Sequence, residues 1–354
     1  MTIKAAEGSM GIEIKRRDIL KLAVLFAVAS RIETGFAMDA APRRNAPETN
    51  DNANVKTQPS SSDNQNAWAI EHHSNFQYIY GNAQTKDAFL LFLTNVYNIY
   101  PQDRFQRLIE EISQSGNSDK EIYSQIQRRL PEITPLLGAV RYALPALSKQ
   151  KTEMTRQTLE LLGATRHVNG YLELGTTGRY ISRLRSEIEL TGDVVLVNAV
   201  APSYSPTDIA ERGQPTKIGR FVSLNDYAPI SSADVPDQSL DLVTNFIGFH
   251  HSPPEKRDSF VQSLARVLRP GGRMIVRDHD VDSEKINRMV ALAHDVFNMG
   301  LGVDWSVNQQ EIRNFTSLNA LTAYLEGFGF KYSAHPQRQA GDPTQNCLIH
   351  FVRT

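Results

Sequence analysis

The sequence predicts an α/β fold with a doubly wound parallel sheet, preceded by a helical module. After about residue 163, short apolar runs alternate with helical patterns, which is the rhythm of a parallel sheet. Between residues 67 and 162, apolar residues instead recur at helical spacing, as Phe89, Phe92, Leu93 and Val96 do. The chain has 354 residues and 40% of them are hydrophobic, which is ample for one large domain and a smaller one.

The first 66 residues differ from the rest in composition. Arg16 and Arg17 precede a short apolar run over residues 22–30, and small residues follow at cleavage-like spacings. Residues 1–37 therefore resemble a twin-arginine export signal, and we expect a periplasmic or secreted protein. The alternative is a short amphipathic helix at the start of a cytoplasmic protein. Residues 38–66 are rich in Ala, Pro, Asn, Ser and Thr and predict a disordered linker.

The helical module is expected over residues 67–162. Phe105, Leu108 and Ile109 repeat the helical spacing, Gly116 interrupts it, and Ser118 suits the N-cap of the next helix. A module of this size often covers a site or forms an oligomer contact. We expect one of these two roles, the second implying a homo-oligomer.

The strands and helices of the α/β domain, residues 163–354, follow in regular order. Strands are expected at 170–174, 194–198, 220–224, 240–246, 273–277, 330–334 and 346–352. Helices are expected at about 180–189, 252–268, 283–297 and 317–325. Ser252 suits the N-cap of the second of these helices, and Arg269-Pro-Gly-Gly272 suits its end.

Composition excludes several classes of protein. A net charge of -1 argues against a nucleic-acid scaffold, because phosphate backbones attract basic faces. Cys347 is the single cysteine, so an intramolecular disulfide framework is impossible. No apolar run approaches the ~18 residues that a membrane-spanning helix needs, so we expect no membrane span.

A glycine turn follows the first expected strand, as Gly175-Thr-Thr-Gly178. Ligands of open parallel sheets bind beyond the carboxyl ends of the strands, and glycine there allows close approach of the backbone. A dinucleotide site would have three glycines as Gly-x-Gly-x-x-Gly, whereas only two are present. Glu173 would repel a pyrophosphate but can accept hydrogen bonds from an ammonium group. The turn therefore favours a ligand with an amino-acid end over NAD.

Four segments in this order resemble the class I S-adenosylmethionine-dependent methyltransferases. They are Glu173-Leu-Gly-Thr-Thr-Gly178, Val235-Pro-Asp-Gln-Ser-Leu-Asp-Leu-Val243, Leu264-Ala-Arg-Val-Leu-Arg-Pro-Gly-Gly-Arg-Met-Ile-Val276 and Tyr324-Leu-Glu-Gly-Phe-Gly-Phe330. The resemblance covers about residues 163–354. It implies a seven-stranded Rossmann-like methyltransferase sheet with an antiparallel last strand, and S-adenosylmethionine as the cofactor.

The resemblance also assigns cofactor contacts by position. It implies that Glu173, Gly175, Thr177 and Gly178 line the methionine end of the cofactor, although Thr177 stands where the family commonly has glycine. It further implies that Asn198, in place of the family's usual acid, holds the ribose hydroxyls. Asp226 would accept a hydrogen bond from the adenine amino group, and Tyr227 would offer a packing surface beside it. Asp226 has the alternative role of shaping a turn after Asn225.

Histidines follow the fourth and fifth expected strands. Methyl transfer to oxygen or nitrogen needs alignment and a base, so His250 and His279 are the candidate catalytic bases. His294 lies on the apolar face of its helix and is expected to be a core histidine. With His279, Asp278, Asp280 and Asp295 it offers metal donors, but their spacing is not diagnostic, and we expect no metal.

Together these features predict an S-adenosylmethionine-dependent methyltransferase that methylates oxygen or nitrogen of a small-molecule acceptor. No basic groove or aromatic strip indicates a nucleic-acid partner. The alternative is a non-catalytic binding protein that keeps the methyltransferase fold without turnover.

Overall fold

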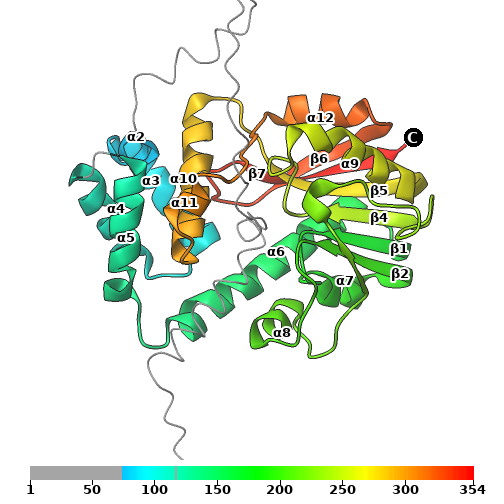
Figure 1. Ribbon diagram of the computed structural model, residues 1–354, viewed down its shortest axis with the longest axis horizontal. Helices are drawn as coiled ribbons and strands as arrows, with labels where there is room; N and C mark the ends of the chain where they lie inside the picture. The colour runs from blue at the N-terminus through cyan, green and yellow to red at the C-terminus, as the bar shows by residue number, and fades with distance from the viewer. Residues whose placement is uncertain (1–73, 116–117) are drawn as a thin grey trace, which may run out of the picture.

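The computed structural model describes residues 74–115 and 118–354, and Figure 1 shows a helical group beside a twisted sheet. The predicted export signal and linker lie outside the described residues. The first helices are α2 (Asn75–Tyr80), α3 (Ala83–Phe92), α4 (Gln102–Ser115), α5 (Asp119–Ile133) and α6 (Leu144–Leu162), with π-helical turns η1 (Leu93–Tyr97) and η2 (Ala139–Ala143). Ser118 caps α5 as predicted, since its side chain accepts from the backbone N–H of Glu121.

The sheet has seven strands in the order β3-β2-β1-β4-β5-β7-β6. They are β1 (His167–Leu174), β2 (Glu189–Asn198), β3 (Arg220–Ser223), β4 (Leu240–Asn245), β5 (Leu268–His279), β6 (Phe330–Arg338) and β7 (Asn346–Arg353). The pairs among β1 to β5 are parallel, and β7 is antiparallel to both β5 and β6. The predicted doubly wound sheet and its antiparallel last strand are confirmed.

Helices cover both faces of the sheet. Helices α9 (Pro254–Val267) and α12 (Leu318–Glu326) pack on one face, and α6 with α7 (Ile181–Glu187) on the other. The remaining elements are α8 (Pro206–Arg212), the 3-10 turn η3 (Asn225–Tyr227), α10 (Glu284–Gly300) and α11 (Trp305–Asn308). Among the described residues, no helix is long and apolar enough to cross a membrane.

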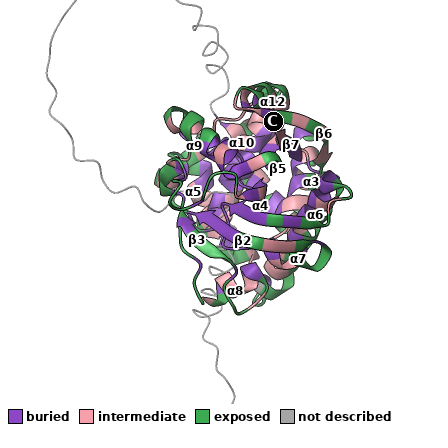
Figure 2. Cartoon of the chain, turned by 90° about the vertical axis from the view of Figure 1, so that its right-hand side faces the viewer, coloured by how far each residue is buried: buried purple, intermediate pink, exposed green. Residues whose placement is uncertain are grey.

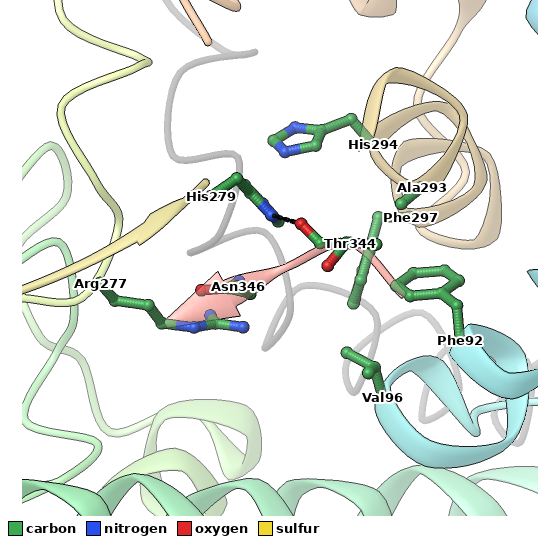
Figure 3. A pocket seen from close by; sticks show the side chains of 9 residues that line it. All are labelled: Phe92, Val96, Arg277, His279, Ala293, His294, Phe297, Thr344 and Asn346. Carbon is green, nitrogen blue, oxygen red and sulfur yellow. Dashed lines mark hydrogen bonds between the residues drawn. The ribbon is translucent and has the colours of Figure 1, made fainter. Parts of the chain in front are cut away.

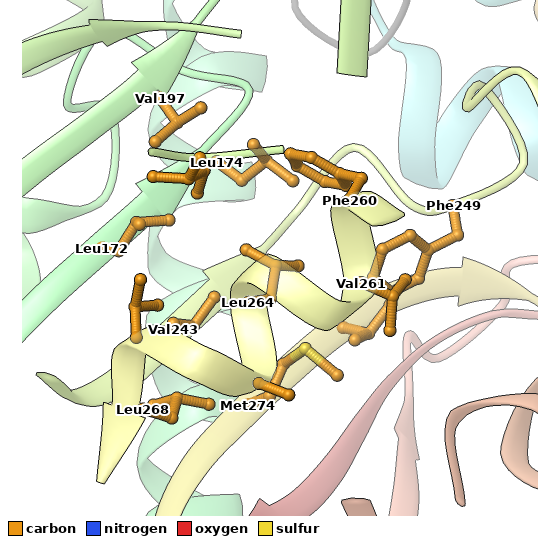
Figure 4. Packing of buried hydrophobic residues seen from close by; sticks show 14 of the residues in the cluster. Leu172, Leu174, Val197, Val243, Phe249, Phe260, Val261, Leu264, Leu268 and Met274 are labelled. Atoms are coloured by element: carbon orange, nitrogen blue, oxygen red, sulfur yellow. The ribbon is translucent and has the colours of Figure 1, made fainter. Parts of the chain in front are cut away.

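The core on the α9 face is built from alternate residues of adjacent strands. Leu172, Val243 and Met274 are fully buried against Phe260 and Leu264 of α9 (Figure 4). Buried residues gather along the strands, and exposed ones lie on the outer sides of helices such as α9 (Figure 2). Each such large apolar side chain contributes roughly 1.5–3 kcal/mol when it leaves water, so this packing fixes the strand ends on which the site is built.

The register brings the carboxyl ends of the central strands to one edge. Leu174 of β1 pairs with Val197 of β2 and with Asn245 of β4, which in turn pairs with Val276 of β5. The chain leaves β1 toward β2 and β3 and then returns to β4, so the order reverses between β1 and β4. This reversal is the place where open parallel sheets bind ligands.

Helices α2 to α5 form the helical group. Helix α10 belongs to the core of this group, although it follows β5 in the chain. Met289, Leu292 and Val296 of α10 are buried in one hydrophobic cluster with residues such as Phe105 and Ile122. Figure 1 shows α10 beside α2 to α5, and α10 packs against α2, α3 and α5. The helical group is therefore completed by a helix from the α/β part of the chain.

Two local predictions at the ends of α9 were wrong. Ser252 is not its N-cap: α9 starts at Pro254, and the Ser252 hydroxyl instead donates to the carbonyl of Phe249. The segment Arg269 to Gly272 is part of β5, with a register shift between Leu240 and Leu242 of the partner strand β4. A proline followed by two glycines is therefore accommodated at the start of this strand, where pairing is irregular.

Candidate functional site

The glycine turn leaves β1 at the sheet reversal. Gly175 and Gly178 have φ angles of +83° and +96°, which side chains other than glycine adopt poorly. A Cβ on Gly175 would lie 2.2 Å from Cγ2 of Ile247, in the loop after β4. The first glycine is therefore required by close packing between the two loops as well as by its backbone conformation. A Cβ on Gly178 would meet no atom within 3.6 Å, so only its positive φ requires glycine.

Glu173 lies beneath the turn with both carboxylate oxygens engaged. Oε2 accepts from the hydroxyl of Tyr171 at 3.0 Å, and Oε1 accepts from the hydroxyl of Thr176 and from the N–H of Tyr180. Burial raises the pKa of Glu173, and these hydrogen bonds oppose that rise. Since each carboxylate oxygen can accept more than one bond, Glu173 both shapes the turn and keeps capacity for a further donor.

Two buried polar groups at this edge have no hydrogen-bond partner. They are Oγ1 of Thr177, in the turn, and Nδ2 of Asn245, the last residue of β4. Because unpaired buried polar groups are costly, a donor and an acceptor beside the turn indicate a place where a polar ligand would satisfy them. The hydroxyl of Thr177 and the carboxylate of Glu173 suit the carboxylate and ammonium groups of a ligand's amino-acid end. The assignment of the turn to the methionine end of the expected cofactor stays a prediction.

The positions assigned to the ribose and adenine differ in exposure. Asn198 is buried at the end of β2, and its Nδ2 donates to the carbonyl of Val200 at 3.1 Å. Asp226 is exposed and forms an ion pair with Lys256. Tyr227 is fully buried, with its ring edge-to-face against Phe260 at 5.2 Å. The cofactor roles of these three residues stay predictions.

A buried ion pair behind the turn was not anticipated from the sequence. The guanidinium of Arg179 donates to both oxygens of Glu211 in α8, at 2.5 and 2.8 Å. Lys151 of α6 donates to the backbone carbonyl of Glu211 at 2.6 Å, and burial lowers the pKa of Lys151 to about 8. These contacts tie the turn to α6 and α8.

The ends of β4 and β5 bring three histidine rings together with one from α10. His250 and His251 follow β4, His279 ends β5, and His294 comes from α10. The ring centre of His250 lies 4.1 Å from that of His251, 5.5 Å from His279 and 5.3 Å from His294. We call His250, His251, His279 and His294 the histidine cluster. The two predicted base candidates therefore lie side by side within it.

Hydrogen bonds fix the orientation of three of these rings. Nδ1 of His250 donates to Oδ1 of Asp278 at 2.6 Å, Nδ1 of His251 donates to the carbonyl of Ile312 at 3.1 Å, and Nδ1 of His279 donates to the carbonyl of Thr344 at 2.9 Å. Carboxylate and carbonyl oxygens only accept, so in each ring Nε2 carries the lone pair. The carboxylate of Asp278, which is adjacent to His279 in sequence, orients the ring of His250 instead.

Burial disfavours the charged form of three rings in the cluster, those of His251, His279 and His294. Burial lowers the pKa of His251 and of His279 well below the usual imidazole value, and the neighbouring His250 lowers both further. Burial likewise lowers the pKa of His294, against the opposing effect of Glu311. Burial would raise the pKa of Asp278, but His250 and the bonds to its carboxylate hold that pKa below its ordinary value. The cluster therefore places three imidazoles of lowered pKa next to a carboxylate whose pKa is also lowered.

A small cavity lies between the cluster and the helical group. Its apolar wall consists of Phe92, Val96, Ala293 and Phe297, and its polar wall of Arg277, His279, His294, Thr344 and Asn346. Figure 3 shows His279, bonded to Thr344, and His294 facing the same space as the aromatic rings. The cavity has a volume of about 20 Å³, roughly the room of one water molecule, so its mixed lining would meet the apolar and polar ends of a small molecule only after neighbouring side chains move apart.

Sequence reasoning missed three parts of this site. His251 received no role from the sequence, and His294 was expected to be a core histidine. The third part is Glu311 with Arg313, whose Nε donates to Oε2 of Glu311 at 2.8 Å next to the cluster. The adjacent pair His250-His251 was the one available signal, because two histidines after a buried strand lie at the ligand-binding edge.

Comparisons with known proteins agree with this geometry. A family model described as a methyltransferase domain matches residues 172–276. The ubiquinone/menaquinone biosynthesis C-methyltransferase UbiE of Stutzerimonas stutzeri is 32% identical over 149 residues, which are 41% of this chain and 54% of that protein. The same enzyme of Pseudomonas aeruginosa is 28% identical over 149 residues, with the same coverage of 41% and 54%. The chain spans about half the length of the curated relatives it matches.

One solved structure has lower sequence identity to this chain but is matched over a larger share of its length. The Burkholderia thailandensis 1,6-didemethyltoxoflavin-N1-methyltransferase shares 14% identity over 68% of this chain and 92% of that one, with a TM-score of 0.38. Residues 172–276 match the methyltransferase-domain family, and the sheet around them has the strand order expected of a class I S-adenosylmethionine-dependent methyltransferase.

Proposed function

We propose that this protein methylates oxygen or nitrogen of a small-molecule acceptor that binds in the cavity beside the histidine cluster. The observation that carries the proposal is the position of that cavity. It lies past the end of β5, at the same sheet edge as the glycine turn, and His279 and His294 form part of its wall.

The cofactor half of the site would be held by the turn. Glu173 and Thr177 offer an acceptor and a hydroxyl to the methionine end, and Gly175 and Gly178 give the backbone the conformation that the turn needs. Asn198 has an amide for the ribose hydroxyls. When bound, S-adenosylmethionine supplies a methyl group on a positively charged sulfur.

The acceptor half is defined by the lining of the cavity. Phe92 and Phe297, at 5.8 Å between ring centres, offer an aromatic wall, and Arg277 and Asn346 offer polar groups opposite. This lining favours a small acceptor with an aromatic or aliphatic body and one polar substituent. Alignment of that substituent at the cluster is the main contribution that the protein makes to transfer. The assignment of His250 or His279 as base stays a prediction on which this proposal does not depend.

A second candidate function is supported by the relatives. The curated relatives carry the name C-methyltransferase of ubiquinone and menaquinone biosynthesis. Transfer to a ring carbon of a phenol or quinol is therefore the second candidate. The two products are isomers of equal mass, so NMR separates them: methylation at oxygen or nitrogen removes an exchangeable proton from that atom, whereas methylation at carbon leaves the hydroxyl intact.

The test begins with the cofactor and ends with turnover. Calorimetry with the full chain is expected to show binding of S-adenosylmethionine and of S-adenosylhomocysteine, and absence of binding at millimolar cofactor would overturn the proposal. A panel of small phenols, amines and quinols is then screened for release of S-adenosylhomocysteine. Binding without release across the panel would favour the non-catalytic alternative. Phe297→Ala should raise the KM for a productive acceptor while leaving cofactor affinity unchanged.

A further inference from the structure

Three imidazole nitrogens converge in the interior without partners. One nitrogen from each of His250, His251 and His294 lies within 4.8 Å of the others, and all three side chains are buried. Nε2 of His250 and Nε2 of His251 have no hydrogen-bond partner, and Nδ1 of His294 has none either but faces the Glu311 carboxylate at 3.7 Å. One unsatisfied buried nitrogen is tolerated at a cost, but three around one point indicate a ligand that accepts lone pairs.

The surroundings of these rings match the second shell of a metal site. Nδ1 of His250 is committed to Asp278 and Nδ1 of His251 to the carbonyl of Ile312, which leaves Nε2 of each ring as the lone-pair donor. Histidines that bind metals characteristically donate their other ring N–H to a carboxylate or a backbone carbonyl. His250 uses a carboxylate and His251 uses a backbone carbonyl. Both rings are therefore held in the tautomer whose Nε2 can bind a metal.

Glu311 adds negative charge next to two of the three rings, His251 and His294. Its Oε1 is buried without a hydrogen-bond partner, 3.6 Å from Nδ1 of His251 and 3.7 Å from Nδ1 of His294. Arg313 holds the other oxygen, so the position of the carboxylate is fixed. Together with Asp278, this carboxylate would compensate the charge of a buried divalent cation.

We propose that His250, His251 and His294 bind a divalent transition-metal ion, for which zinc is the best-suited candidate. Imidazole donors favour zinc, cobalt, nickel and copper over magnesium and calcium, which prefer oxygen. Zn–N bonds of about 2.0–2.1 Å would draw the three nitrogens closer together than they now lie. Three protein ligands leave a fourth position for a water or a substrate atom, as in catalytic zinc sites.

The fourth position would face the acceptor. His294 is both one of the three ligands and part of the cavity wall, and His279 lies beside it at 5.7 Å between ring centres. An ion bound here would coordinate an acceptor hydroxyl or amine and act on it as a Lewis acid. This use of the ion rests on the proposed function, whereas metal binding itself does not. The proposal replaces the sequence expectation of no metal.

The first experiment measures metal binding by the full chain alone. Tag-free protein is stripped with a chelator, loaded with Zn²⁺, dialysed and analysed by mass spectrometry for metal content. About one ion per chain should be retained in the presence of excess Mg²⁺ and Ca²⁺. Co²⁺ in place of Zn²⁺ should give the visible absorption of a low-coordinate site. A wild-type protein that retains no zinc and shows no such cobalt spectrum would overturn the proposal.

Variants connect the binding to these residues. His250→Ala, His251→Ala and His294→Ala should each weaken zinc binding by roughly tenfold or more. His294→Cys should keep the ion and add a thiolate-to-cobalt absorption band, which a merely structural role would not produce. The matched control is His350→Gln, since His350 is another buried histidine with an unpartnered nitrogen, outside the cluster. Wild-type zinc content in all three alanine variants would contradict the assignment.

The two proposals can fail separately. Zinc retention is measured without S-adenosylmethionine, and cofactor binding is measured by calorimetry on metal-free protein. If the protein retains zinc but does not bind the cofactor, the metal site stands and the proposed methyltransferase function fails. If the protein binds the cofactor but retains no zinc, the proposed function stands and the metal site fails.

Discussion

At the scale of single residues, His350 on β7 is a buried histidine that is harder to protonate in the native protein than in the unfolded chain. Its Nδ1 is hydrogen-bonded to the hydroxyl of Ser333 at 2.7 Å. Burial, together with the neighbouring charge of Arg273, lowers the pKa of His350 from 6.5 to about 4. Below pH 6.5 the unfolded chain therefore binds a proton that the native protein does not bind.

The first prediction concerns the pH dependence that follows from His350. Its stabilising contribution should be fully present above pH 6.5 and be lost as the pH falls from 6.5 toward 4, by about 1–3 kcal/mol. His350→Gln should therefore flatten the fall in the free energy of unfolding over that interval. Urea denaturation at a series of pH values measures it, and parallel curves for the two proteins would refute the assignment.

The second prediction compares a buried ion pair with an exposed one. Glu211→Gln removes the charge that faces the Arg179 guanidinium, which is only 2% exposed, and should cost about 3–5 kcal/mol. Asp193→Asn breaks the Arg220 pair, in which both side chains are 40% exposed, and should cost under about 1 kcal/mol. Chemical denaturation of both variants gives the comparison. Equal losses would show that Glu211 does not counter a buried charge.

At the scale of elements, the contact between α10 and η1 leaves no room for a methyl group. A Cβ on Gly300 would lie 1.8 Å from the Tyr97 hydroxyl oxygen. Tyr97 has little freedom to move, because its ring is buried between Phe105 and Phe297. Its hydroxyl has no hydrogen-bond partner, so removing that oxygen should cost little.

The third prediction is a compensating pair at this contact. Gly300→Ala should destabilise the protein by about 1–3 kcal/mol through overpacking. Tyr97→Phe alone should be nearly neutral, and the double variant Tyr97→Phe, Gly300→Ala should recover much of the loss. Thermal or denaturant unfolding of the four proteins completes the cycle. Strict additivity would mean that the two groups do not meet.

The strands could be predicted from the sequence, whereas short helices could not. Apolar runs such as Val194 to Val197 are separated by turn residues, and the structure places β2 over Glu189–Asn198. Helix α8 has seven residues and α11 has four, too few to show a helical period. Sequence patterns likewise placed His250 and His279 at neighbouring strand ends. They could not bring in His294, because its approach depends on how α10 packs, not on spacing along the chain.

At the scale of the whole molecule, the fourth prediction concerns location. Residues 1–37 have the pattern of a twin-arginine signal, a route that carries folded proteins. Arg16→Lys combined with Arg17→Lys should trap the precursor inside the cell, while Lys15→Arg should leave export unchanged. Cell fractionation followed by immunoblotting measures both variants. Equal distribution of the double variant and the wild type would contradict a twin-arginine signal.

Helix α10 contributes side chains both to the core of the helical group and to the histidine cluster at the sheet edge. We therefore expect the helical group and the sheet to unfold together. Met289 and Val296 are buried among the helices, and His294 of the same helix lies in the cluster at the sheet edge. Hydrogen bonds also hold the end of α10 to the other helices, since the Tyr123 hydroxyl donates to the Val303 carbonyl at 2.7 Å and the Tyr100 hydroxyl donates to the Gly300 carbonyl. Unfolding the helical group would therefore expose the apolar face of α10 and dismantle the cluster.

The fifth prediction is that probes in the two regions report one transition. Trp305 packs on Tyr123 at 5.3 Å and reports on the helical group, once Trp68 is replaced by phenylalanine. Cys347 on β7 is buried, with its pKa raised to about 12 by burial, so its reaction with a thiol reagent reports on the sheet. Denaturation curves from the two probes should coincide. Ile109→Ala, in the core of the helical group, should shift both curves by an equivalent of about 2–5 kcal/mol. A shift confined to the tryptophan curve would mean that the helical group can unfold while α10 stays folded against the sheet.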